Sequence, residues 1–250
     1  MPETRSLVIT RRHLLASTAA LAMSGLGSDA FGRTYRGALP WEPNSADPPV
    51  AVRPGPWLYF TADEAAVVEA IADRLIPADE SGPGGKLAGC AVFIDRQLAG
   101  SYGDSRRLYM RPPFAKGLPT QGAQSPSVPK AQYRSSLAAL DAYCKQTFSR
   151  KGFSALSASE QDQVLTGLDK NEIKLGDASG KEFFELILQN TMEGFFADPI
   201  YGGNRDMAGW TLIGFPGARY DYRDHIGKHN QPYPLPPVSI LGRKDWDIPG

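Results

Sequence analysis

The chain has 250 residues, of which 42% are hydrophobic, so it is long enough for one domain of ordinary size with a buried core. Basic and acidic residues are equal in number, 27 of each, and this balance leaves no overall basic excess for binding nucleic acid through its phosphates. We therefore expect no nucleic-acid partner.

Residues 1–30 have the layout of an export signal. Basic residues, among them Arg11 and Arg12, precede an apolar stretch at 14–27, and small residues follow it up to Ala30. The stretch is shorter than the roughly 20 residues that a membrane-spanning helix needs. An arginine pair before a short, modestly apolar run is typical of the twin-arginine pathway, and an ordinary secretory signal is the alternative. We predict twin-arginine export of a folded chain.

Residues 31–60 are rich in proline, which fixes φ and removes backbone donors, so an extended strap is expected there rather than a helix. The strap contains Trp41 and Trp57. Two large aromatic side chains favour a strap that lies against another surface over a flexible linker. Both tryptophans are therefore candidates for a partner interface.

Helical periodicity begins after the strap, and about five helices are expected within residues 61–198. Three of them should begin with a capping box, in which a serine or threonine and a glutamate three residues later bond each other's backbone: Thr61 with Glu64, Ser157 with Glu160, and Ser179 with Glu182. The expected apolar faces contain, in chain order, Val68, Ile71, Ala72 and Leu75; Cys90, Phe93, Ile94 and Leu98; Tyr133, Leu137, Leu140, Cys144 and Phe148; Val164, Leu165 and Leu168; and Phe183, Phe184, Ile187, Leu188, Met192 and Phe195. Strands do not alternate with these helices, so we predict a mainly α fold, a small bundle without a parallel sheet.

From residue 199 to residue 250 the chain is rich in glycine, proline and aromatic residues, and we expect a long irregular tail. Aromatic side chains on irregular backbone cannot form a core alone. They must pack on the helices or on a partner, where aromatic residues are favoured contacts. We predict Trp210, Phe215 and Tyr220 as partner-interface residues, with packing in the core as the alternative.

Cys90 and Cys144 are the two cysteines of the chain. In an oxidising compartment, two cysteines suggest one disulfide. Both also lie at apolar helix positions, so a pair of buried free thiols is an alternative, and a bridge to another subunit is a third.

The sequence has few features that indicate catalysis, cofactor binding or metal binding. The sequence contains neither a nucleophile elbow, a P-loop, a dinucleotide-binding glycine fingerprint, nor a haem attachment motif. Carboxylates and histidines occur between Asp221 and His229, but Gly227 separates the two histidines and four prolines follow, which argues against a shared metal. We predict that this chain holds no catalytic, cofactor-binding or metal-binding residue.

Three segments together resemble one protein family: FTADEAAVVEAIADRLIPADE (60–80), GCAVFIDRQLAG (89–100) and TMEGFFADPIYGGNRDMAGWTLIGFPGARYDY (191–222). They are similar to the small subunit, called subunit 3 or gamma, of membrane-bound gluconate 2-dehydrogenase and related flavin-dependent sugar and polyol dehydrogenases. The likeness covers about residues 60–225 and the signal. The last segment is the most specific, because it is a long string of glycine, proline and aromatic positions.

The resemblance implies a subunit without a cofactor of its own. In that family a GMC-type large subunit carries FAD and oxidises the substrate, and a multihaem cytochrome c subunit passes the electrons to the membrane quinone pool. The small subunit brings the twin-arginine signal, and the folded flavin subunit is exported with it by the twin-arginine translocase. The resemblance therefore implies a periplasmic, membrane-associated complex in which this chain serves export, assembly and stability. The alternative is an independent exported binding protein or metalloenzyme that uses the Asp221–His229 region.

Overall fold

The structure, a computed structural model, describes residues 52–53, 55–115, 117–121, 126–176, 179–219 and 221–240. Arg11, Arg12, Trp41 and Tyr220 lie outside these residues, so their predicted roles remain predictions.

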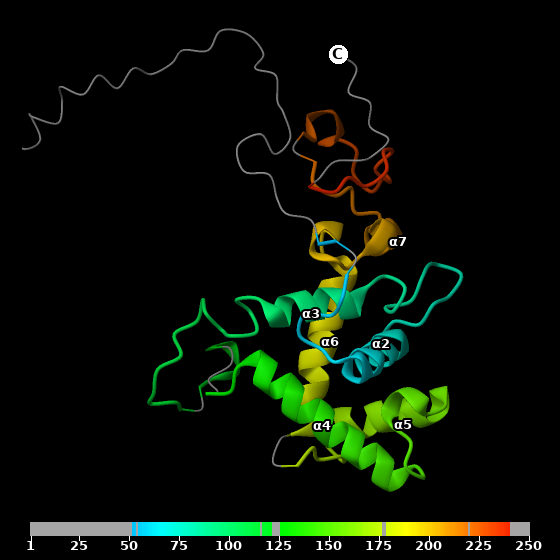
Figure 1. Cartoon of the computed structure of the whole chain (residues 1–250). Helices are drawn as coiled ribbons and strands as arrows, with labels where there is room; N and C mark the ends of the chain where they lie inside the picture. The colour runs from blue at the N-terminus through cyan, green and yellow to red at the C-terminus, as the bar shows by residue number, and fades with distance from the viewer. Residues whose placement is uncertain are drawn as a thin grey trace, which may run out of the picture. The chain divides into compact units, whose positions relative to one another are not determined.

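All five expected helices are present: α2 (Ala62–Leu75), α3 (Cys90–Ala99), α4 (Pro129–Thr147), α5 (Ala158–Asp169) and α6 (Gly180–Phe196) (Figure 1). A sixth, α7 (Ala208–Ile213), lies in the tail that was predicted to be irregular. Short 3₁₀ helices occur as η2 (Pro119–Gln121), η3 (Phe153–Ala155), η4 (Pro199–Tyr201), η5 (Arg205–Met207) and η6 (Arg223–His225). The mainly α prediction is confirmed, and within the described residues no strand forms.

Two of the three predicted capping boxes form completely. The hydroxyl of Thr61 accepts from the backbone of Glu64 while the Glu64 carboxylate accepts from the backbone of Thr61, and Ser157 with Glu160 does the same. At the third, the Ser179 hydroxyl accepts from the Glu182 backbone but donates to Oδ1 of Asn171 at 3.2 Å. That site is therefore a simple N-cap tied to the end of α5 rather than a reciprocal box.

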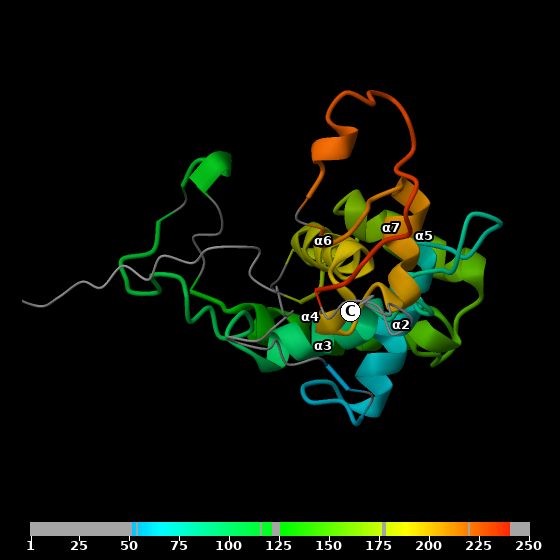
Figure 2. The same cartoon turned by 90° about the horizontal axis from the view of Figure 1, so that it is seen from above.

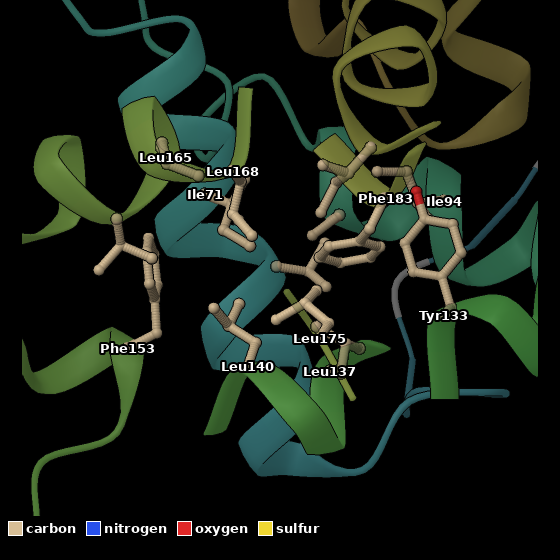
Figure 3. Packing of buried hydrophobic residues seen from close by; sticks show 14 of the residues in the cluster. Ile71, Ile94, Tyr133, Leu137, Leu140, Phe153, Leu165, Leu168, Leu175 and Phe183 are labelled. Atoms are coloured by element: carbon tan, nitrogen blue, oxygen red, sulfur yellow. The ribbon is translucent and has the colours of Figure 1, made fainter. Parts of the chain in front are cut away.

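Helix α6 is the centre of the bundle, because α2, α3, α4, α5 and α7 all contact it. The main core contains side chains from five helices, and Figure 3 shows how they converge: Ile71 of α2, Ile94 of α3, Tyr133 and Leu140 of α4, Leu168 of α5 and Phe183 of α6. Complete burial of one such side chain stabilises the fold by about 1.5–3 kcal/mol relative to leaving it in water. The bundle thus supports the segments that pack on its surface.

The prediction for one residue of the apolar face of α6 is wrong. Met192 was expected in the core, but its side chain is 49% exposed, while the polar residues Asn190 and Thr191 are buried. Asn190 is needed inside because its Oδ1 accepts from the hydroxyl of Tyr133 at 2.9 Å and from that of Tyr102 at 3.2 Å. A buried tyrosine hydroxyl requires such a partner.

The end of the proline-rich strap is fastened to the core by Asp95, a fully buried carboxylate on α3. Its two oxygens accept from three successive backbone N–H groups, those of Leu58, Tyr59 and Phe60, each at 2.9 Å. The neighbouring Arg96 pairs with the same carboxylate and donates to the carbonyl of Pro56 at 3.1 Å. The turn that leads into α2 is therefore built around one buried negative charge.

Candidate functional site

The Asp221–His229 region does not assemble a metal site. Asp221 pairs with Arg223, whose Nη2 lies 2.5 Å from Oδ2, and this pairing lowers the pKa of Asp221 to about 2. The ring of His225 packs against Tyr233, with centroids 4.8 Å apart, and His229 is exposed. No group of three histidine, cysteine, aspartate or glutamate side chains that could hold a metal gathers anywhere in the described ranges. A nearby hollow of about 440 Å³ is lined by Asp221, Tyr222, Arg223 and Ile226, and the Asp221 carboxylate in it is already paired with Arg223.

The tail is tied back onto the end of α6 by a second buried carboxylate, that of Asp198. Its Oδ1 accepts from the Ile200 backbone at 3.0 Å and from the Ser239 hydroxyl at 2.8 Å, and its Oδ2 accepts from the Ile240 backbone at 2.8 Å. Residue 198 thus joins the first residues of the tail to residues 239–240. The tail leaves α6, turns in solvent and returns to the same place (Figure 2).

Between Asp198 and α7, the backbone lies directly on α6. A Cβ atom at Gly203 would collide with the carbonyl oxygen of Gly194, and one at Gly209 would collide with that of Phe195. Asn204 holds the turn in place, since its side chain donates to the Ala197 carbonyl and accepts from the Gly209 backbone, each at 2.8 Å. This approach seats α7 against the last turn of α6.

On α6, on α7 and in the turn after α7, five large apolar residues remain exposed, and we call this set the α6–α7 face. It consists of side chains that are each between 37% and 59% exposed: Met192, Phe196, Leu212, Ile213 and Phe215. Met192 and Phe196 are four residues apart and share one side of α6. Trp210 lies beneath, with its Nε1 donating to the Phe196 carbonyl at 2.7 Å and its ring 5.1 Å from that of Phe215. A surface of this kind is typical of a site where another molecule docks.

The aromatic residues predicted at a partner interface have different environments. Trp210 is 5% exposed and packs inside the chain, as the alternative reading of the sequence allowed. Trp57 is half-buried against the main core, with its ring edge-on to Phe60 at 6.4 Å. Phe215 is 43% exposed and belongs to the α6–α7 face. Of the three, Phe215 is the one whose side chain a partner can contact extensively.

The predicted disulfide is not formed, because Cys90 and Cys144 are both free and completely buried. They pack in different places: Cys90 with Ala72, Ala88 and Phe195, and Cys144 in the main core. The alternative of two buried thiols therefore describes them. Burial raises the pKa of the Cys90 thiol to about 12 and that of Cys144 to about 11.

We expect both thiols to resist alkylation in the folded chain. At pH 8 their raised pKa values leave about one thiol in a thousand or fewer as the reactive thiolate, and burial excludes the reagent as well. Treatment with iodoacetamide, followed by mass spectrometry, should find no adduct on the native protein and two adducts after unfolding in urea without reductant. A disulfide would give no adduct in urea until a reductant is added, and rapid labelling of the native chain would contradict burial.

Two features of this site, and one of the fold, were not predicted from the sequence. Leu212 and Ile213 were not recognised because α7 has only six residues and its start depends on contacts with α6. Phe196 was not singled out, because spacing alone does not show where α6 extends past its neighbours. Asp95 carried a usable signal: it lies between Ile94 and Leu98 on the buried side of α3, where a carboxylate requires a specific partner.

Comparison with known proteins gives one match. The family model described as Gluconate 2-dehydrogenase subunit 3 matches residues 62–217. The match covers more than half of the chain, including all of α2 to α7, so the chain belongs to this family, as the resemblance predicted. No curated protein and no solved structure matches. In the described part of the chain, no helix is long and apolar enough to cross a membrane.

Proposed function

We propose, from this family membership, that the chain is a non-catalytic small subunit of a gluconate 2-dehydrogenase-type complex. In this proposal the catalytic partner is an FAD-containing large subunit, and a multihaem cytochrome c subunit receives its electrons. The small subunit carries the twin-arginine signal for the folded flavin subunit, stabilises it, and places the complex in the periplasm at the membrane. FAD and haem c belong to the partner subunits and not to this chain.

The main support for this proposal is that the segment matched by the family model contains a set of exposed apolar residues. Residues 191–215 lie inside the family match, and they build both the close packing of α7 on α6 and the α6–α7 face. Five large apolar residues are exposed there, at 37% to 59% each, on α6, α7 and the turn that follows α7. A rigid apolar face suits stable docking of a protein subunit. We therefore assign the α6–α7 face as the contact with the flavin subunit.

The test is to replace two exposed residues of the face, Ile213→Ser with Phe215→Ser, and to purify the tagged chain from cells that make the native complex. Loss of two apolar contacts costs about 1–2 kcal/mol each, so we expect roughly 30- to 900-fold weaker association with the flavin subunit. Flavin fluorescence and the identity of the co-purifying chains, measured against the unmodified protein, report the loss.

The matched control is Leu58→Ser with Leu87→Ser, because these side chains are each 64% exposed and lie outside the α6–α7 face. Unfolding midpoints of both double variants should stay close to that of the unmodified chain, since all four side chains are exposed. Equal recovery of the flavoprotein by both variants would show that the assigned face is wrong. Recovery of no flavoprotein by the unmodified chain would contradict the proposed function itself.

A further inference from the structure

The loop between α3 and α4 has a local excess of positive charge, although the chain as a whole has equal numbers of basic and acidic residues. From residue 105 to residue 140 the sequence contains no aspartate or glutamate. In the described part of this segment, Arg106, Arg107 and Arg111 are all exposed. Arg107 and Arg111 form no ion pair within the described residues, so their charges face solvent.

The base of the loop is closed, and its one acidic residue is paired there. The backbone N–H of Lys130 donates to the Gly103 carbonyl at 3.2 Å, which ties the two ends together. Asp104 sits at this base and pairs with Lys130 and with Arg106. The Lys130 contact, with that of Arg106, lowers the pKa of Asp104. The loop beyond this base extends away from the helices in both views (green in Figures 1 and 2).

Large apolar side chains are interleaved with these arginines. Leu108 is 62% exposed, Tyr109 is 84% exposed and Phe114 is 37% exposed. These three therefore do not fill the core of the chain. A protein-docking patch usually has an apolar centre and a polar rim. Here arginine and apolar residues instead alternate along one extended segment.

We propose that residues 106–114 bind the surface of an anionic lipid bilayer. The arginines contact the phosphate groups of the lipid heads, while Leu108, Tyr109 and Phe114 insert at the level between head groups and acyl chains. Charge complementarity favours a lipid surface, because a cationic segment that has no acidic residue from position 105 onward matches a uniformly anionic surface. Leucine and aromatic residues beside basic ones are the composition of segments that lie in the membrane interface. This chain thereby contacts the membrane itself, independently of which subunits it joins.

The experiment places a fluorescent label on the loop of the full chain. Ala115 is exposed, and the variant Ala115→Cys gives one accessible thiol because Cys90 and Cys144 are buried. The matched control label is at Lys170→Cys, exposed at the end of α5. An environment-sensitive dye at each position is followed during titration with vesicles of phosphatidylglycerol and phosphatidylcholine, and with vesicles of phosphatidylcholine alone. Binding through the apolar stretch at 14–27 would persist when the loop arginines are replaced, so the arginine variant described below separates the two.

We expect the dye at 115, but not at 170, to shift to the blue on the anionic vesicles, and the shift to decline with added salt. Replacing Arg106, Arg107 and Arg111 together by glutamine should weaken binding of the chain to the anionic vesicles about 100-fold. Each arginine contributes about 1 kcal/mol near such a surface, and every 1.4 kcal/mol is a tenfold change in affinity. The charge-matched control, Lys151, Lys170 and Lys174 replaced by glutamine in the Ala115→Cys chain, should leave it unchanged, since those lysines are exposed elsewhere.

Three results would overturn the proposal. One is a dye at 115 that does not respond to anionic vesicles. Another is an equal shift on neutral vesicles that the arginine variant leaves unchanged. The third is a dye at 115 that becomes buried in the lipid-free purified complex, because the loop would then be a protein interface.

Discussion

Replacing Asp95 by alanine should lower the free energy of unfolding by about 4 kcal/mol, because each unsatisfied buried donor costs about 1–3 kcal/mol. The carboxylate is fully buried and accepts from three backbone N–H groups. Alanine leaves these donors without an acceptor and leaves Arg96 beside them without its countercharge. The measurement is equilibrium unfolding in urea, followed by circular dichroism, with the midpoint compared between variants.

The matched control is Asp162→Ala, which removes an aspartate that is 48% exposed and pairs with Arg74 at 2.7 Å. An exposed pair of this kind contributes about 1 kcal/mol or less, so the control should shift the midpoint only slightly. The variant Asp95→Asn, which keeps one acceptor oxygen, should lie between the two. If Asp95→Ala unfolded at the same urea concentration as Asp162→Ala, the anchoring role of Asp95 would be wrong.

The second large effect is expected from Arg11→Lys with Arg12→Lys. If the chain carries the export signal for a folded flavin subunit, loss of the arginine pair should remove nearly all substrate-dependent dye reduction from the periplasm and leave it in the cytoplasm. Lysine preserves the charge, so a loss would reflect recognition of arginine rather than of basicity. Activity in separated periplasmic and cytoplasmic fractions measures the result.

The control for this experiment is Arg5→Lys, a substitution of the same kind outside the pair. It should leave the distribution of activity unchanged. Normal periplasmic activity in the Arg11→Lys, Arg12→Lys variant would contradict export through this chain. Loss of activity from both fractions would instead indicate failed synthesis, which an immunoblot of this chain in each fraction distinguishes.

Local signals in the sequence were sufficient to predict the helical bundle. The capping residues Thr61 and Ser157 and the terminators Pro77 and Gly100 act within a few residues, so their effect is visible without the tertiary structure. The family resemblance was likewise legible in contiguous segments and is confirmed by the match.

The residues of the α6–α7 face could not be predicted in the same way. Helix α7 begins after Met207 in the left-handed region, at φ 56°, a conformation that spacing and propensity do not predict. Its position depends on the Gly209 backbone touching the Phe195 carbonyl, which is a contact between separate elements. Met192 was expected on the buried face of α6 but is 49% exposed, whereas Trp210, predicted at an interface with core packing as the alternative, is 5% exposed.

The glycines that pack on α6 also limit what can be inferred from the segment 191–222, the part of the sequence most specific to the family. In the string from Thr191 to Tyr222, Gly203 and Gly209 are required by backbone contact, and Asn204 by the turn that it braces. These residues are therefore required by the way the backbone crosses α6, and they carry no information about the substrate. Small subunits that accompany dehydrogenases of different specificity should share them equally. A genome survey that uses this string would therefore find members of the subunit 3 family without indicating which substrate each complex oxidises.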